Sequence, residues 1–500
     1  MFTQKWRDHW GLARDPFACE DADKDPVLSQ IDPSAVHSGF DRVFGNPEVP
    51  SPGIVFGEKG SGKSGLRLMM RRRIESHNKA HPQAKVFQVE YIDFDVQMEQ
   101  LRQSIRGSND PRKAAKAVVD AWKLSDHLDA ILALGVTRLL DCCLEGGERP
   151  ADFKRKQKVD LLLLSALYDS SQRRTTDEAL SGLRSALHPR LAHAVWRKFL
   201  AIAVTILAVF AALVPHIASW QEWGNVGQSN YWYGAGAVLA LLTWGWYGIG
   251  NLLLDWDAKK TIKHVRVISQ DASPLASILK GLSPKEREEY LLPSGTDDAS
   301  RFDLLSRFLG VLAGFGYGGC YVMVDRVDEP SLLSGNEEHM KRFVQKLLDI
   351  KLLQYRDLAL KLFLPIEMET LYRNANSEEL KRMRLDKSNL IGELKWTGQE
   401  LYEVANQRLL ASLAPGSSVK ELRDLFDEDL EFAHIKETLS TLATPRYAFG
   451  FLSAVFSEHV RDLPNELATE ASDWQVPRAH FDVQRAAWID RTGVLRRSLN

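Results

Sequence analysis

Residues 53–64 read Gly-Ile-Val-Phe-Gly-Glu-Lys-Gly-Ser-Gly-Lys-Ser, a short apolar run followed by a glycine-rich turn. Residues 57–64 fit the pattern G-x-x-x-x-G-K-[ST], with a predicted strand before the turn and a predicted helix, Leu66 to Glu75, after it. Glycines let backbone N–H groups wrap around phosphates, and the helix N-terminus adds partial positive charge. The pattern therefore predicts a nucleotide site in which Lys63 reaches the β- and γ-phosphates and the Ser64 hydroxyl ligates Mg²⁺. The residues predicted to hold the nucleotide are Gly57, Glu58, Lys59, Gly60, Ser61, Gly62, Lys63, Ser64 and Gly65.

A second apolar run ends in an acid and supplies the expected partner of the turn. Residues 320–325 read Cys-Tyr-Val-Met-Val-Asp, and Asp325 would hold Mg²⁺ through water at the carboxyl edge of a sheet. The base that activates the attacking water must lie farther out, so Asp328 and Glu329 are both candidates. The simplest pattern has a glutamate directly after the Mg²⁺ acid, but this chain has Arg326 there, and the choice between the two acids stays open.

Two long uncharged stretches lie between these motifs, one between Lys198 and Glu222 and one from Trp223 to Leu254. Each is long enough to cross the ~30 Å hydrocarbon core of a bilayer, for which a helix needs about 20 apolar residues. The loop at 218–230 holds no Lys or Arg, so the positive-inside rule predicts that both long arms are cytoplasmic. We therefore expect residues 199–254 to anchor the chain in the inner membrane by two spans. The flanking basic residues are Arg190, Arg197, Lys198, Lys259, Lys260, Lys263 and Arg266.

The remaining apolar runs predict an α/β fold with the parallel sheet of a P-loop NTPase. Runs without polar alternation suit strands that are covered on both faces. The glycine-rich run Gly314–Gly319 precedes a strand instead of following one, so we interpret it as a loop and not as a dinucleotide site. The predicted strands are Gly53–Gly57, Val86–Asp95, Tyr321–Asp325 and Leu360–Glu367.

The spacing of the motifs predicts one NTPase domain interrupted by a helical insert and a transmembrane hairpin and followed by a helical lid. A capping box at Thr397 and Glu400 begins a helix of that lid. The predicted domains are residues 1–97, the N-terminal segment and first half of the NTPase domain; 98–192, the helical insert; 193–258, the hairpin; 259–375, the second half of the NTPase domain; and 376–500, the lid.

The composition of the 500 residues excludes several classes of protein. Lys+Arg 64 against Asp+Glu 66 give a net charge of −2, whereas a dedicated nucleic-acid binder carries a strong basic excess. The 4 cysteines form no CxxC pair and have no histidine partners at metal-ligand spacing, which indicates reduced thiols. Neither apolar span contains Asp, Glu, Lys or Arg, so a transporter with an ion path is the least favoured class.

The chain resembles the KAP-type P-loop NTPases, a group near the STAND and AAA+ ATPases. The resemblance rests on GEKGSGKS, on VMVDRVDE and on the transmembrane pair between them, and it covers residues 40–100 and 300–460. The second motif of that family usually ends in Asp-Asp-x-Asp-Arg, so this chain departs from it at two positions. The resemblance implies ATP and Mg²⁺ as ligands, and it implies that Arg384 and Arg446 stabilise γ-phosphate charge within the chain or across a subunit interface.

These features predict a membrane-anchored ATPase that faces the cytoplasm and couples hydrolysis to a conformational change or to the assembly of a partner complex. The resemblance implies protein partners, homo-oligomers among them, and for bacterial members a part in phage exclusion or defence. One alternative is a nucleotide-switched membrane scaffold with little turnover, which Arg326 in place of the expected glutamate favours. Another is an oligomeric AAA+-like motor, in which Arg384 or Arg446 would enter the site of a neighbouring subunit. Nucleic acid is not indicated as a partner.

Overall fold

The chain forms two compact units in the computed structural model. Unit 1 contains Met1–Phe94 and Gly318–Asn500, and unit 2 contains Asp95–Tyr317. Residues 259–317, which the sequence analysis groups with the NTPase domain, pack with unit 2 instead. The structure describes residues 4–19, 21–31, 37–105, 110–150, 153–189, 193–220, 229–290, 292–295, 297–373, 378, 389–463 and 472–499.

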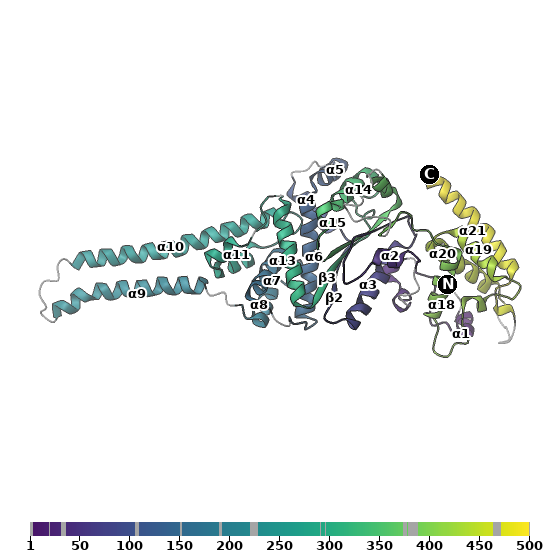
Figure 1. Ribbon diagram of the computed structural model, residues 1–500, viewed down its shortest axis with the longest axis horizontal. Helices are drawn as coiled ribbons and strands as arrows, with labels where there is room; N and C mark the ends of the chain where they lie inside the picture. The colour runs from purple at the N-terminus through teal and green to yellow at the C-terminus, as the bar shows by residue number, and fades with distance from the viewer. Residues whose placement is uncertain are drawn as a thin grey trace. The chain divides into compact units, whose positions relative to one another are not determined.

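Unit 1 is built on a sheet of five strands in the order β2-β3-β4-β1-β5 (Figure 1). The strands pair in parallel, with Val55 opposite Phe363 and Val322 opposite Leu360, which confirms the predicted α/β class. Every residue of β1 and β4 is buried, as expected for strands covered on both faces. The strands are β1 (Gly53–Gly57), β2 (Lys85–Tyr91), β3 (Tyr317–Val324), β4 (Leu358–Pro365) and β5 (Leu390–Ile391).

The bounds of β2, β3 and β4 differ from the prediction, and one further strand was not predicted. β4 covers Leu358–Pro365, where Leu360–Glu367 was predicted. β3 begins at Tyr317, so the second half of the run Gly314–Gly319 is strand and not loop. Glycine suits this place because a Cβ on Gly319 would overlap Pro50. β2 ends at Tyr91, and Asp95 begins the next helix. The two-residue strand β5 is too short to leave a pattern in the sequence and was not predicted.

The sheet of unit 1 is accompanied by helices from both halves of the unit. The phosphate turn leads directly into α3, the longest of the helices that follow a strand of this sheet. The helices of unit 1 between α1 and β5 are η1 (Ala22–Lys24), η2 (Leu28–Gln30), α2 (Phe40–Phe44), α3 (Lys63–Ala80), α14 (Glu337–Gln345), η3 (Lys346–Leu348), α15 (Ile350–Leu353), η4 (Ile366–Met368) and α16 (Glu369–Arg373).

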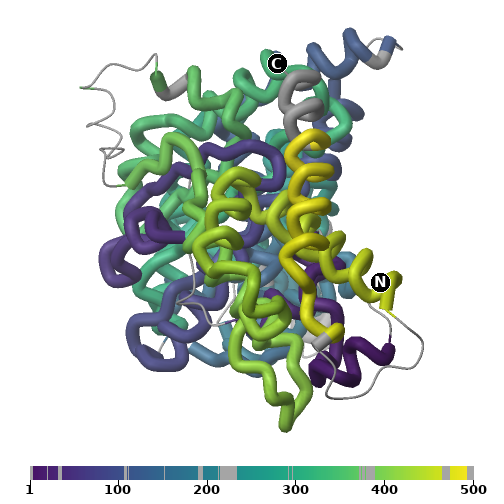
Figure 2. The backbone as a smooth tube through the Cα atoms, turned by 90° about the vertical axis from the view of Figure 1, so that its right-hand side faces the viewer, coloured from purple at the N-terminus to yellow at the C-terminus, as the bar shows by residue number. Residues whose placement is uncertain are grey.

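The C-terminal helices share one apolar core with the first helix of the chain. Trp6 is fully buried in this core, its Nε1 donates to the carbonyl oxygen of Trp474 at 3.3 Å, and its ring lies 5.3 Å from that of Phe456. Figures 1 and 2 both show the purple N-terminal helix beside the green and yellow C-terminal helices. The predicted capping box is present, since Glu400 N–H donates to the Thr397 hydroxyl at 3.1 Å. The helices are α1 (Gln4–Trp10), α18 (Gly398–Leu410), η5 (Leu422–Leu425), α19 (Phe432–Leu442), α20 (Pro445–Asp462), η6 (Ser472–Trp474) and α21 (Arg478–Leu499).

Unit 2 is helical throughout its described elements. Its two longest helices, α9 and α10, lie side by side (Figure 1). The helices are α4 (Asp95–Ser104), α5 (Pro111–Ala121), α6 (Leu124–Leu144), α7 (Arg155–Tyr168), α8 (Thr176–Leu187), α9 (His193–Trp220), α10 (Ser229–His264), α11 (Ala272–Gly281), α12 (Pro284–Glu288) and α13 (Asp298–Gly314).

Among the described helices, one segment, Gly234–His264 of α10, is long and apolar enough by composition to cross a membrane. Only 6% of its most apolar window is buried, which distinguishes it from the core helix of a soluble protein. Large apolar side chains are exposed along both α9 and α10; among them are Phe199, Ile206, Leu207, Phe210, Leu241, Leu242, Leu252 and Leu253.

A buried lysine fastens the chain segment that leads into β1. Lys361 of β4 is fully buried, and its Nζ donates to the carbonyl oxygens of Val43 and Ser51, both at 2.7 Å. The same nitrogen lies 4.9 Å from the ring centre of Tyr321. Burial lowers the pKa of Lys361 to about 7.

We expect Lys361 to make the stability of unit 1 rise with pH. Between pH 7 and 10 the unfolded lysine keeps its proton while the folded one loses it, so the unfolded state binds more protons and the free energy of unfolding increases, by on the order of 3 kcal/mol. The Lys361→Met variant lacks this increase. From pH 7 to 10, the Tm of the wild type should therefore rise relative to that of Lys361→Met. Relative to Lys346→Met, which changes an exposed lysine, the Tm of the wild type should show no such rise. A difference independent of pH would contradict the lowered pKa.

Candidate nucleotide-binding site

The glycine-rich turn connects β1 to α3 at the carboxyl edge of the sheet, in the context that the sequence predicts. Gly60 and Gly62 have φ angles of +85° and +95°, which residues with a Cβ rarely adopt. A Cβ on Gly60 would also lie 2.8 Å from the Cβ of Arg446. The backbone path of the turn therefore requires glycine at both positions.

The polar groups of the turn fit a phosphate ligand. α3 begins at Lys63, and its N-cap residue Gly62 has no side chain to accept hydrogen bonds from the first N–H groups. The Ser61 hydroxyl is buried and has no hydrogen-bond partner among the described residues. Donors at the start of an 18-residue helix, together with its dipole, form an anion-binding site.

Three carboxylates interact electrostatically with Lys63. Its Nζ donates to the carbonyl oxygen of Gly57 at 2.7 Å. Burial lowers the pKa of Lys63, and the carboxylates of Asp325, Asp328 and Glu367 raise it. The structure thus brings the predicted residues Asp325 and Asp328 into the electrostatic range of Lys63.

Glu367 is an acid of the site that the sequence analysis does not single out. It lies in η4, directly after β4, and β4 separates β1 from β3 in the sheet. An acid that follows an apolar strand is the same signal that identifies Asp325. The sequence alone gives no strand order, however, so it could not place Glu367 beside Lys63. Glu367 joins Asp328 and Glu329 as a candidate base.

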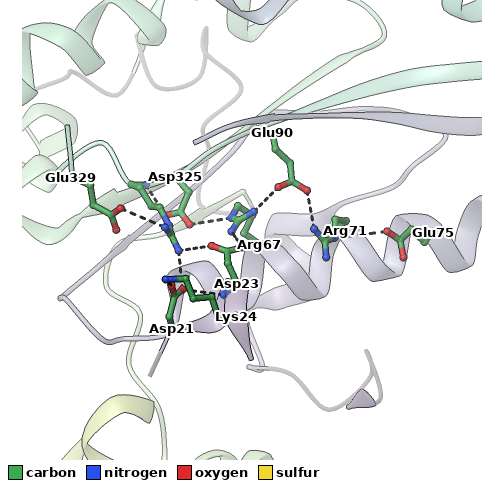
Figure 3. A network of polar contacts seen from close by, with 10 residues as sticks. Asp21, Asp23, Lys24, Arg67, Arg71, Glu75, Glu90, Asp325 and Glu329 are labelled. Carbon is green, nitrogen blue, oxygen red and sulfur yellow. Dashed lines mark hydrogen bonds and ion pairs between the residues drawn. The ribbon is translucent and has the colours of Figure 1, made fainter. Parts of the chain in front are cut away.

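Asp325 follows β3 as predicted and is bound to a buried arginine (Figure 3). Its Oδ2 accepts from Nε of Arg67 at 3.1 Å, and its Oδ1 accepts from the backbone N–H of Arg326 at 2.9 Å. Arg67 of α3 is fully buried and also donates to Glu90 of β2, at 2.8 Å, and to Asp23 of η1. One guanidinium therefore joins α3, β2, β3 and the N-terminal segment.

Arg326 is the second cation of this network. Its φ is +61°, and its guanidinium pairs with Asp21 at 3.1 Å and with Asp23. It also pairs at 3.5 Å with Glu329, whose side chain is 61% exposed. Partial burial raises the pKa of Glu329, Arg326 lowers it, and the carboxylate of Asp328 raises it further. One of the two predicted bases is therefore engaged by the arginine that stands in the position of the expected glutamate.

Arg67 and the acids that share it with Asp325 come from three separate segments, so the network as a whole could not be predicted. Asp23 and Glu90 follow no short-range pattern with Arg67 or Asp325. Arg67 did leave a signal, since it interrupts the apolar run Leu66–Met70 in the first turns of α3. A charge inside an apolar helix face is rarely buried without a partner.

Two groups from the C-terminal part of unit 1 contact the turn, one just before α18 and one in the first turn of α20. Trp396 donates from Nε1 to the carbonyl oxygen of Ser61 at 2.7 Å, and the backbone N–H of Arg446 donates to the carbonyl oxygen of Gly60 at 3.3 Å. Burial is the main cause that lowers the pKa of Lys63, and the nearby Arg446 guanidinium lowers it further. The structure thus places Arg446 beside the turn, whereas Arg384 lies outside the described residues.

Ser64 and Asp325 are the predicted Mg²⁺ residues, and the structure allows both roles. A carboxylate has about four acceptor positions, and Arg67 and the Arg326 N–H use two of those of Asp325. Within the described ranges, no group of three or more His, Cys, Asp or Glu side chains could hold a metal directly. These residues therefore fit an ion held by Ser64 and phosphate oxygens, with Asp325 acting through water.

No family model, no curated protein and no solved structure matches the chain. The assignment of the site therefore depends on its residues and their geometry.

Loss of the Arg67 guanidinium should destabilise unit 1. Arg67→Ala leaves Asp23, Glu90 and Asp325 without their shared cation, and breaking a buried ion pair typically costs about 3–5 kcal/mol. Denaturant titration followed by tryptophan fluorescence measures the loss. The control is Arg71→Ala on the same helix, because the Arg71 side chain is 40% exposed and exposed pairs contribute about 0–1 kcal/mol. Equal losses in the two variants would show that the Arg67 network is not an important source of stability.

Proposed function

We propose that the chain is a membrane-anchored nucleoside triphosphatase that binds Mg-ATP at the turn 57–64 on the cytoplasmic side. The observation that carries the proposal is the glycine turn at the carboxyl edge of a parallel sheet, with Lys63 at the start of α3. Ligands of open parallel sheets bind at that edge, and helix N-termini there bind phosphate. The proximity of Lys63 to the acids after β3 and β4 supports hydrolysis in addition to binding.

The residues of the site have separable roles in this proposal. Lys63 and the N–H groups of the turn would hold the phosphates, and Ser64 and Asp325 would hold Mg²⁺, which neutralises charge on the phosphate oxygens. Arg446 would add positive charge from the C-terminal helices, which would couple their position to the state of the nucleotide. The candidates for orienting the attacking water are Asp328, Glu329 and Glu367.

A nucleotide-switched scaffold with little turnover is the second candidate, and one observation favours it. Arg326 follows Asp325 directly and holds Glu329 in an ion pair. A carboxylate that is held by a guanidinium must leave that ion pair before it can orient the attacking water. If Glu329 is the base, turnover requires that Arg326 release it.

The membrane part of the proposal assigns both α9 and α10 to the bilayer, with residues 199–254 as the anchor. The segment Gly234–His264 meets the length and composition of a span, and exposed apolar side chains continue on α9. The basic residues at the same end of the two helices support the orientation with both units in the cytoplasm.

Lys63→Ala should abolish ATP hydrolysis by the detergent-purified full chain. The lysine holds transferred-phosphate charge, and its loss typically lowers such rates by at least about 100-fold. The control is Lys79→Ala, which removes an exposed lysine from the far end of α3 and should leave turnover within about twofold. Phosphate release from Mg-ATP measures both. Hydrolysis that survives in Lys63→Ala would remove the turn from the proposed site.

The same assay separates the candidate bases and the two functions. Asp328→Asn, Glu329→Gln and Glu367→Gln each remove one carboxylate, and the base is the one whose loss lowers kcat without weakening ATP binding. Tight ATP binding by the wild type, with turnover no higher than in Lys63→Ala, would favour the scaffold.

Deletion of residues 199–254 should release a soluble body. The deletion removes the exposed apolar side chains of α9 and most of those of α10, which are stable only in contact with lipid or detergent. The measurement is the share of the protein that stays in membranes after a carbonate wash, because the wash removes peripheral proteins and leaves spanning ones. Full-length chain in the wash, or deleted chain in the membrane, would contradict the anchor.

A further inference from the structure

Arg197, near the start of α9, is held against α10 without an acidic partner. Its side chain is buried, and its Nη2 donates to the backbone carbonyl oxygen of Trp246 at 3.2 Å. The guanidinium carbon lies 4.5 Å from the centre of the Trp246 ring. Its Nε has no hydrogen-bond partner, and no carboxylate lies within 4.0 Å of the guanidinium, among the residues that the structure describes. The positive charge of Arg197 is therefore only partly compensated.

Gly250 has no side chain and so leaves room for the Arg197 guanidinium against α10. It lies one helical turn after Trp246, and a Cβ on Gly250 would overlap the Arg197 guanidinium. Gly248, two residues earlier on the same helix, has no atom within 4 Å of the place of its Cβ. Glycine lowers helix stability by about 1 kcal/mol relative to alanine. At position 250 this cost is accompanied by room for the Arg197 guanidinium, which an alanine side chain would take away.

A second arginine adds its charge to the first. Burial lowers the pKa of Arg287, in α12, and the nearby Arg197 guanidinium lowers it further. Asp257 raises it, but no salt bridge of 4.0 Å or less joins Arg287 to an acid in the described part of the chain. An anion bound at Arg197 would reduce the repulsion between the two guanidiniums, which Asp257 offsets only in part.

We propose that Arg197 binds the phosphate of an acidic phospholipid headgroup at the base of the α9–α10 pair, with Arg287 adding positive charge. This inference rests on the proposed membrane anchor, because the base of the apolar pair then lies at the level of the headgroups. A guanidinium suits this ligand because it offers paired N–H donors to phosphate oxygens. Other cations and aromatic rings around the site suit the same interface; they are Trp196, Lys198, Trp256, Lys259, Lys260 and Lys263.

The test is a titration of the detergent-purified full chain with phosphatidylglycerol, phosphatidylcholine or inorganic phosphate, with bound molecules counted by native mass spectrometry. We expect phosphatidylglycerol to bind about tenfold more tightly than phosphatidylcholine, the effect of one charge-assisted contact. Gly250→Ala keeps every charge but displaces the Arg197 guanidinium, and it should remove this preference. Gly248→Ala is the matched control and should keep it.

Charge-matched variants separate a built site from general attraction to acidic lipid. Arg197→Gln combined with Arg287→Gln should abolish the preference, whereas Lys259→Gln combined with Lys260→Gln, at exposed positions, should retain most of it. Equal losses in the two pairs, equal behaviour of the two glycine variants, or binding of inorganic phosphate as tight as that of phosphatidylglycerol would each overturn the lipid site. Recovery of the wild type in the carbonate wash would instead overturn the membrane anchor, and that result is independent of the titration.

Discussion

The buried guanidinium of Arg67 is the interaction on which the arrangement of unit 1 depends. It bonds to acids from β2, from the end of β3 and from the N-terminal segment, and it belongs to the helix that carries the phosphate turn. A buried ion costs several kcal/mol unless it is paired, so these elements must meet at one point. The first cation alone leaves an excess of acids, which Arg326 reduces. A glutamate in place of Arg326, as the simplest pattern has it, would add another acid to a cluster of Asp21, Asp23, Glu90 and Asp325.

The parts of the site that the sequence predicts are those determined by neighbouring residues. The turn, its helix and the acid after β3 each follow from a short pattern, and the structure places all three at one edge of the sheet. Glu367 and the partners of Asp325 could not be predicted, because their positions depend on strand order and on contacts between distant segments. The misplaced start of β3 has a local cause, since its glycines resemble those of a loop but fit beside Pro50.

The C-terminal helices were predicted as a lid, and two groups from this part of unit 1 contact the turn. Trp396 and Arg446 bond to the carbonyl oxygens of two successive residues of the turn. The core of these helices also holds Trp6, so the N-terminal segment is fixed at its start in that core and near Asp23 by the Arg67 network. A ligand that moves the turn would act on the lid directly and on the N-terminal segment through α3.

The insertion of unit 2 between the halves of unit 1 has a consequence for biosynthesis. β1 pairs only with β4 and β5, and both are translated after the whole of unit 2. The apolar helices α9 and α10 therefore leave the ribosome while β1 still has free edges on both sides. Unpaired strand edges promote aggregation, so early contact of α9 and α10 with lipid would keep the nascent chain apart from its neighbours until the sheet closes.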